Sequence, residues 1–315
     1  MTKKSTFLLL SGLFLIVGAA SIALNLRIRS MVDERMEEFV SAGYYQSLDY
    51  AVVWLMPDGE IIMRDLHVVD TENNEYVLKE IAVSEFDYFN EFPHHLKLSV
   101  SGMHFPGGIP ATNNLSTSAW HTYIESIIDE DVLPISVAYG YDYSPDNKHY
   151  MENDFSIELP GSFLLTASSE IENISLLQLD SVGLGPGTSA TQYSSSLQDS
   201  RILGAEITVQ DMGLVPAILA AQGEAVDLDP SEYRQQLMQQ MQALAVFAPQ
   251  QFQFVAKDLV LRIGKLLEGG KTLRVSVSPE FEGNVQELQS EIMDAFYTAN
   301  FERIYEVLNP KIEIY

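Results

Sequence analysis

Apolar and polar residues alternate without interruption in the stretch ISVAYGYDY, residues 135–143. Successive side chains of a β-strand point to opposite faces, so this spacing predicts a strand with one apolar face and one wet face. The apolar and aromatic positions are Ile135, Val137, Tyr139, Tyr141 and Tyr143. We call these five residues the tyrosine row. Two interpretations remain open: the row is core beneath the protein's own helices, or it lines a groove for an acyl chain or a partner strand.

The same period of two recurs from residue 49 to about residue 178 and predicts antiparallel hairpins. The run AVVWLMPDGEIIMRDLHVVD turns at Pro57-Asp58-Gly59, and the tyrosine row turns at residues 144–147 and returns as DFSIEL. Residues 118–132 have the spacing of a short helix, whereas residues 179–196 are rich in Gly and Ser and predict a loop.

The C-terminal third changes to a helical pattern with clear start and stop signals. Asp229-Pro230-Ser231-Glu232 is typical of a helix start, and Asn284 with Glu287 is typical of a second. The helix after Pro230 is predicted to turn Tyr233, Leu237, Met241 and Leu244 toward a core. A further helix is expected to end at Gly269-Gly270, and KIEIY at the C-terminus predicts an edge or closing strand. The fold class expected is α+β, with helices packed on an antiparallel sheet after a β-rich meander.

The N-terminal residues contain an uncharged run from Phe7 to Leu26. About 20 residues span a bilayer core of roughly 30 Å, so the run predicts a transmembrane helix that continues into a short amphipathic helix over 29–43. A signal peptide cut near Ser21-Ile22-Ala23 is the alternative. The residues predicted to anchor the chain in the membrane include Phe7, Leu10, Phe14, Val17 and Leu24.

These patterns divide the chain into four predicted parts. Residues 1–28 form a cytoplasmic tip and the anchor, and residues 29–48 form a juxtamembrane helix. Residues 49–200 form a β-rich part, and residues 201–315 form an α+β C-terminal part. Lys3 and Lys4 favour an N-terminus inside the cell, with the bulk of the chain outside the cytoplasm.

The net charge of the chain limits the classes of partner that it can bind. It has 44 acidic and 18 basic residues, for a net charge of -26. Such a surface repels nucleic-acid phosphates and anionic lipid headgroups, so any lipid must bind through apolar contact. The chain has no cysteine, which excludes disulfides, thiolate catalysis and Cys-ligated metals.

No motif predicts catalysis, a cofactor or a metal. His94 and His104 share one face of a predicted strand but lie too far apart to bind one metal. Asp227, Asp229 and Glu232 lack the turn glycine and the terminal glutamate of a calcium loop. No G-x-S-x-G sequence occurs, although a serine hydrolase triad dispersed through the fold stays open as an alternative.

Two segments carry a family resemblance. AYGYDYSPDNKHYMENDFSIELPGSFLLTASSEI and ILGAEITVQDMGLVPAILAAQG, after a basic start and one apolar run, resemble the YdgA-like and, more distantly, the AsmA-like bacterial envelope proteins. The resemblance implies a periplasmic β-rich domain held at the inner membrane. It also implies binding of lipid or of an envelope protein along an apolar sheet face.

The sequence thus predicts a non-enzymatic, single-pass protein of the bacterial inner membrane, with most of the chain in the periplasm. Its expected ligand is a lipid acyl chain or another envelope protein, bound at the tyrosine row. A periplasmic hydrolase and a purely structural assembly factor are the alternatives. No cofactor and no nucleic acid is expected.

Overall fold

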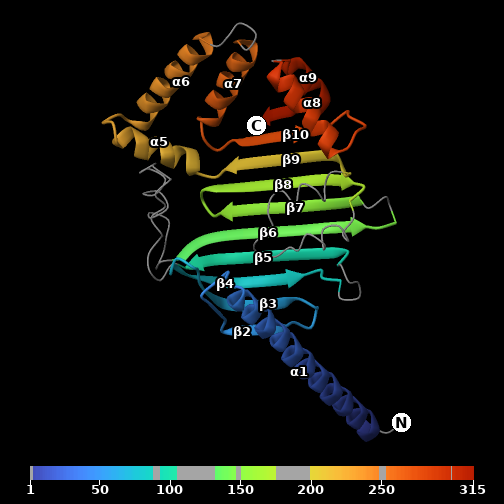
Figure 1. The fold of residues 1–315 in the computed structure, drawn as a ribbon. Coiled ribbons are helices and arrows are strands. Elements are labelled where there is room, and N and C mark those ends of the chain that lie inside the picture. Colours follow the sequence, from blue (N-terminus) through green and yellow to red (C-terminus); the bar gives the residue numbers. More distant parts are fainter. Residues whose placement is uncertain are drawn as a thin grey trace. The chain divides into compact units, whose positions relative to one another are not determined.

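The computed structural model describes residues 3–87, 93–104, 132–146, 150–174, 199–247, 253–298 and 300–315 (Figure 1). The chain forms two compact units, unit 1 over residues 1–110 and unit 2 over residues 111–315. The predicted helix over 118–132 and the predicted loop over 179–196 lie outside the described residues or at their border.

Unit 1 pairs one long helix with an antiparallel sheet. Its elements are α1 (Lys3–Ser41), β1 (Ser47–Asp49), β2 (Val52–Leu55), β3 (Ile61–Val69), β4 (Glu75–Ser84) and β5 (His95–His104). Strand β3 pairs with β4 on one side, and β4 pairs with β5. On its other side β3 pairs with β1 and β2. The predicted hairpin at Pro57-Asp58-Gly59 is confirmed, with Gly59 at φ 94°, where a side chain would be strained.

Helix α1 is hydrogen-bonded to the outer edge of β2. The Asn25 side chain is buried, and its amide accepts a hydrogen bond from the Leu55 N–H and donates one to the Leu55 carbonyl oxygen. One turn further along, the Arg29 guanidinium lies 5.9 Å from the Tyr50 ring centre, and a turn beyond that Asp33 accepts a hydrogen bond from the Tyr50 hydroxyl. An exposed strand edge is a template for pairing with other chains, so Asn25 also blocks unwanted association at β2.

The structure corrects the predicted membrane anchor. No helix in the described part of the chain is both long enough and apolar enough to cross a membrane, which overturns the transmembrane helix predicted over Phe7–Leu26. The apolar run does not stand alone, because α1 continues unbroken to Ser41 through a charged second half. The five anchor positions, Phe7, Leu10, Phe14, Val17 and Leu24, all belong to this one helix.

Unit 2 contains a six-stranded antiparallel sheet. The strands are β6 (Val132–Ser144), β7 (Tyr150–Leu159), β8 (Phe163–Glu172), β9 (Arg201–Asp211), β10 (Thr272–Val277) and β11 (Lys311–Ile314). Each strand pairs with the next in this order. The predicted meander through the tyrosine row is therefore confirmed, and KIEIY supplies the edge strand β11.

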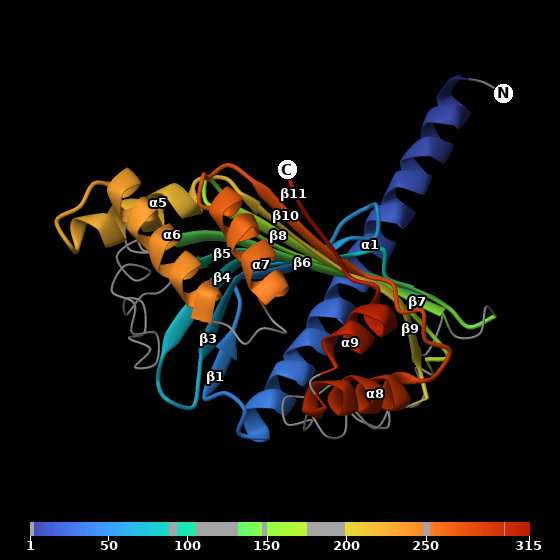
Figure 2. The ribbon, with the colours of Figure 1, turned by 90° about the horizontal axis from the view of Figure 1, so that it is seen from above.

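The described part of unit 2 also contains five helices. They are α5 (Leu214–Glu224), α6 (Pro230–Phe247), α7 (Gln253–Leu266), α8 (Val285–Tyr297) and α9 (Phe301–Leu308). Figure 2 shows α5–α7 and α8–α9 on the same side of the unit 2 sheet, near opposite ends of its strands. The predicted caps are confirmed: Asp229 accepts hydrogen bonds from the Ser231 and Glu232 N–H groups, and Asn284 forms a capping box with Glu287.

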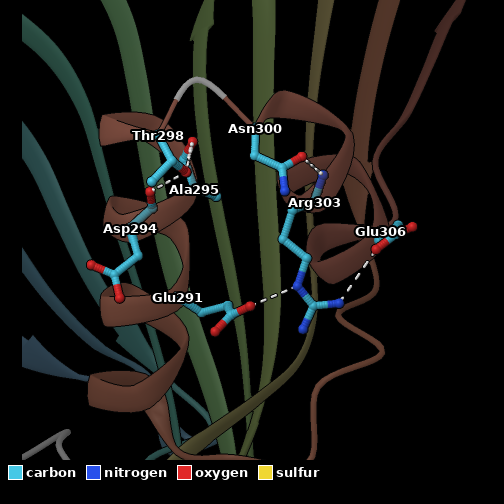
Figure 3. A network of polar contacts seen from close by, with 7 residues as sticks. All are labelled: Glu291, Asp294, Ala295, Thr298, Asn300, Arg303 and Glu306. Carbon is cyan, nitrogen blue, oxygen red and sulfur yellow. Dashed lines mark hydrogen bonds and ion pairs between the residues drawn. The ribbon is translucent and has the colours of Figure 1, made fainter.

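Helices α8 and α9 form a tight pair held by one arginine (Figure 3). The Arg303 guanidinium bonds Glu291 of α8 at 2.6 Å and Glu306 of α9 at 3.3 Å. The inner sides of the pair bury Leu288, Ala295 and Val307. Helix α9 was not expected from the sequence, because only eight residues separate its caps Asn300 and Asn309.

The buried side of α6 differs from the predicted one at its C-terminal end. Leu244 is 70% exposed, whereas Ala245 is 7% exposed, so the predicted core position of Leu244 is wrong. The other predicted positions, Tyr233, Leu237 and Met241, are half-buried. The side of α6 that meets α7 also includes Met238, which lies against Gly264 of α7.

Candidate functional site

The register of the unit 2 sheet brings apolar residues from all six strands into one row. Residues paired directly across antiparallel strands lie on the same face. Starting from Tyr139, successive partners are Phe155, Ala167, Ile207, Val275 and Ile312. The parallel row two residues away consists of Val137, Ile157, Leu165, Val209, Leu273 and Ile314. Neither row contains a charged residue, so we call this surface the uncharged face.

Part of the uncharged face is open to solvent. Tyr139 is 37% exposed and Ile207 is 50% exposed, although both belong to long, regularly paired strands. The helices of unit 2 stand near the two ends of the strands (Figure 2). Exposed apolar side chains in the middle of a sheet are costly in water, so an opening of this kind commonly marks a binding surface.

One end of the uncharged face carries neutral polar groups. The Tyr139 hydroxyl donates to Asn153 Oδ1 at 3.2 Å, and Asn153 Nδ2 donates to Ser169 Oγ at 3.3 Å. Asn153 pairs with Tyr141 on one side and with Ser169 on the other, so these groups cross three strands in a line. Burial raises the pKa of Tyr141, the strand partner of Asn153, above its ordinary value. We call Tyr139, Asn153 and Ser169 the polar ladder.

Beyond the polar ladder the sheet is closed. Tyr143 is 8% exposed, and its hydroxyl donates to the Ile174 carbonyl oxygen at 3.4 Å. Its strand partner Met151 is 6% exposed. The tyrosine row therefore runs from an exposed residue, Tyr139, to a buried one, Tyr143, along a single face of β6.

At the other end of the strands, Asp211 ties the helices to the sheet. Its carboxylate accepts hydrogen bonds from the N–H groups of Gly213, Val215 and Gly270, which belong to the start of α5 and to the turn between α7 and β10. Gly213 adopts φ 144°, and a Cβ there would lie 2.6 Å from the Gly161 carbonyl oxygen. Only glycine fits between the two turns, so this corner fixes where α5 leaves the sheet.

The opposite face of the sheet is charged. Between the two apolar rows lie Ala138, Ser156, Thr166, Thr208, Arg274 and Glu313 on that face. Arg274 bonds Glu206 at 2.5 Å, and burial is incomplete for both side chains. A hollow of about 330 Å³ on this face is lined mainly by glutamate, serine and backbone of β7–β10. The cation in this lining is Arg274, and its partner is Glu206.

The described histidines belong to unit 1. His67 and His104 flank the buried Val77 on one face of β3–β5, beside a hollow of about 580 Å³. The same hollow is lined by Asp65 and Lys79, which form an ion pair at 3.4 Å. No group of three metal-ligating side chains occurs in the part of the chain that the structure describes. His121 and His149 lie outside the described residues.

Sequence reasoning found the β6 part of the candidate site and missed the rest. All five residues of the tyrosine row lie on one face of β6, as the alternation predicts. Ile207 and the polar ladder residues Asn153 and Ser169 were not singled out. Only the strand register joins them to Tyr139, and no local signal in a single sequence gives that register.

The fold and the site define unit 2 as an antiparallel α+β domain with one uncharged and one charged sheet face. The chain belongs to a protein family described as "Uncharacterized protein", whose family profile matches residues 156–313. The match lies within unit 2 and runs from β7 into β11, so it includes all five helices of that unit. No curated protein matches the sequence.

Proposed function

We propose that the protein is a non-enzymatic binding protein that holds an amphiphilic lipid on the uncharged face of unit 2. The observation that carries the proposal is the open middle of this face, where Tyr139 and Ile207 stay exposed within long, regularly paired strands. A lipid acyl chain laid across β6–β10 would remove these side chains from water.

The dimensions of the face support an acyl chain. Adjacent strands lie about 4.8 Å apart, so the six residues of the row from Tyr139 to Ile312 extend over roughly 24 Å. The row is aliphatic or aromatic throughout, and a second apolar row lies beside it. An extended acyl chain is a flexible apolar ligand that can follow such a surface without needing a directional partner.

The polar ladder supports an amphiphile rather than a pure hydrocarbon. Asn153 and Ser169 offer uncharged donors and acceptors at the border of the apolar rows. Such groups suit an ester, amide or hydroxyl next to an acyl chain. A charged headgroup would have to project into water, because the two apolar rows contain nothing to pair with it.

The proposal includes no chemical step. The alternative hydrolase would need a histidine within hydrogen-bond reach of a serine and a carboxylate. The described histidines are His67, His94, His95 and His104. They belong to strands or turns of unit 1, whereas the residues of the uncharged face belong to unit 2. A location in the bacterial cell envelope stays a prediction from the family resemblance.

The experiment is native mass spectrometry of the full chain purified from bacterial membranes or cytosol, followed by lipid extraction. Ile207→Glu places a carboxylate on the uncharged face, and Gln210→Glu places one on the charged face of the same strand. Both positions are exposed, so both variants should fold.

We expect lipid on the wild-type chain and on the Gln210→Glu variant, and little or none on the Ile207→Glu variant. Equal lipid on the two variants would place the lipid elsewhere. A wild-type chain that never carries lipid, yet retains a co-purified protein that Ile207→Glu releases, would replace the lipid by a protein partner.

A further inference from the structure

The tip of the α6–α7 pair exposes large apolar side chains. Phe247 is 84% exposed and Leu244 is 70% exposed, and the two lie three residues apart on one side of α6. Leu261 on α7 is 67% exposed. Figures 1 and 2 show that the end of the pair where α6 stops and α7 starts points away from the unit 2 sheet.

This exposure does not come from loose packing between the two helices. Their facing sides are closed: Ala245 is 7% exposed and Val260 is 9% exposed. A Cβ at Gly264 would lie 2.8 Å from Met238 Cε, so the glycine lets α6 and α7 approach closely. Leu244, Phe247 and Leu261 are therefore additional to the residues that hold the pair together, and they stay exposed among the described residues.

The charge around the tip differs from that of the whole protein. The chain has 44 acidic residues in 315, which would put about three or four in any 25 residues. The 25 residues from Tyr233 to Lys257 contain none. The charged residues in this stretch are Arg234 and Lys257. Leu244 and Phe247 thus lie in a carboxylate-free stretch of a protein with net charge -26, and the next carboxylate along the chain, Asp258, is paired with Arg262.

The second helical pair of unit 2 provides an internal contrast. Tyr297 at the end of α8 is 77% exposed, nearly as much as Phe247. The α8–α9 pair, however, carries Glu287, Glu291, Asp294, Glu302 and Glu306. Carboxylates next to an apolar patch are repelled by lipid phosphates and are costly to bring to a bilayer interface. Both pairs expose aromatic side chains, but the residues from Tyr233 to Lys257 around Phe247 contain no carboxylate, whereas Asp294 and Glu302 lie within five residues of Tyr297.

We infer that the α6–α7 tip docks on a phospholipid bilayer surface. Leu244 and Phe247 enter the interface, and Lys257 near the start of α7 lies on the side of the headgroup phosphates. Apolar contact provides most of the attraction, because one cation adds little once salt screens it. The acidic remainder of the chain is repelled by the same surface, which orients the tip toward the membrane. This inference uses residues other than those of the uncharged face, so it stands or falls independently of the lipid-binding proposal.

The test uses the absence of native cysteine. Single-cysteine variants Phe247→Cys, Leu244→Cys and Tyr297→Cys of the full chain are labelled with an environment-sensitive fluorophore. Each is mixed with vesicles of phosphatidylcholine and phosphatidylglycerol, with and without nitroxide-bearing lipids. The emission maximum reports entry into the interface, and nitroxide quenching reports direct contact with lipid. Vesicle flotation of the unlabelled wild type and of Phe247→Asp measures binding separately.

We expect a blue shift and nitroxide quenching at positions 247 and 244, and neither at position 297. Phe247→Asp should lower the bound fraction several-fold, and Tyr297→Asp should leave it unchanged. A chain that floats with vesicles while the label at position 247 stays in water overturns the inference, because another part of the chain then binds. A blue shift that grows with protein concentration without vesicles also overturns it and indicates a second copy as the partner. A chain that does not float at all refutes it outright.

Discussion

The two faces of the unit 2 sheet are made by the same six strands and differ in nearly every physical property. The row that starts at Tyr139 has no charged member. The adjacent row on the other face starts at Gly140 and continues through Asp154, Ser168, Glu206, Ser276 and Lys311. Strict alternation along each strand separates these two sets, and a register slip of one residue would exchange them.

The difference between the faces shows which one can bind an apolar ligand. The charged face keeps its carboxylates in water, and its hollow is lined by polar groups that gain nothing from an apolar ligand. The uncharged face exposes the apolar side chains of Tyr139 and Ile207 in the middle of its strands. Its middle can lower its free energy only by contact with another apolar surface.

The largest difference in stability is expected between substitutions at two adjacent residues near the end of β7. Leu159 lies on the uncharged side and is 2% exposed, whereas the adjacent Glu158 is exposed on the other face. Leu159→Ala should lower the free energy of unfolding by about 2–5 kcal/mol, because a buried cavity is left. Glu158→Ala should change it by less than about 0.5 kcal/mol. Urea denaturation of both variants checks this, and equal effects would contradict the assignment of the two faces.

A second effect is expected at the corner that positions α5 and α7. Asp211→Ala removes the acceptor of three backbone N–H groups and should lower the free energy of unfolding by about 3 kcal/mol. Asp211→Asn keeps a side-chain oxygen of the same size and should recover part of that loss. Thermal unfolding measures both. If the alanine variant is as stable as the wild type, the helices are not held over the uncharged face through this residue.

A smaller effect is expected where α7 covers the last strand. The Arg262 guanidinium donates to the Ile312 carbonyl oxygen of β11 and bonds Asp258 within α7. Arg262→Ala should lower stability by about 1 kcal/mol and leave the β11 edge open to pairing with another chain. Analytical ultracentrifugation should then show association that grows with concentration, and Lys265→Ala on the same helix should not. A strictly unchanged sedimentation profile would show that the edge is blocked by other means.

The smallest effect concerns the ionisation of Tyr141. Burial raises the pKa of this hydroxyl above its ordinary value of 10.0, so the unfolded chain releases the proton at lower pH than the folded chain does. The linked stabilisation is complete below about pH 10 and is lost as the pH rises through the folded pKa. Tyr141→Phe should therefore make the alkaline decline in the free energy of unfolding less steep. Urea denaturation of the variant and the wild type at several pH values above neutrality measures this, and an equally steep decline in both would contradict the assignment.

Local signals in the sequence predicted the local structure well. The Pro57-Asp58-Gly59 turn, the Asp229 cap and the Asn284 capping box are set by residues within four positions of one another. The polar groups of each turn or cap bond to nearby backbone atoms, so a single sequence is enough to predict these features. The alternation of the tyrosine row likewise identified a strand and its apolar side.

Predictions that depended on distant partners were less successful. Which side of α6 is buried depends on α7 and Gly264, so Leu244 was assigned to the core although Ala245 occupies it. The apolar N-terminal run predicted a membrane span, but the helix that contains it continues to Ser41 and is bonded to β2 through Asn25. The candidate site shows the same limit, because Ile207 joins Tyr139 only through the pairing of four strands.

The most direct test of the account compares neighbouring residues on opposite faces of β9. The chain has no native cysteine, so Ile207→Cys and Thr208→Cys can each be labelled with benzophenone alone. After irradiation in the presence of phospholipid, mass spectrometry of the labelled peptide identifies a covalent lipid adduct. The account predicts an adduct at position 207 and none at position 208. An adduct of equal yield at both positions, or at position 208 alone, would contradict the assignment of lipid to the uncharged face.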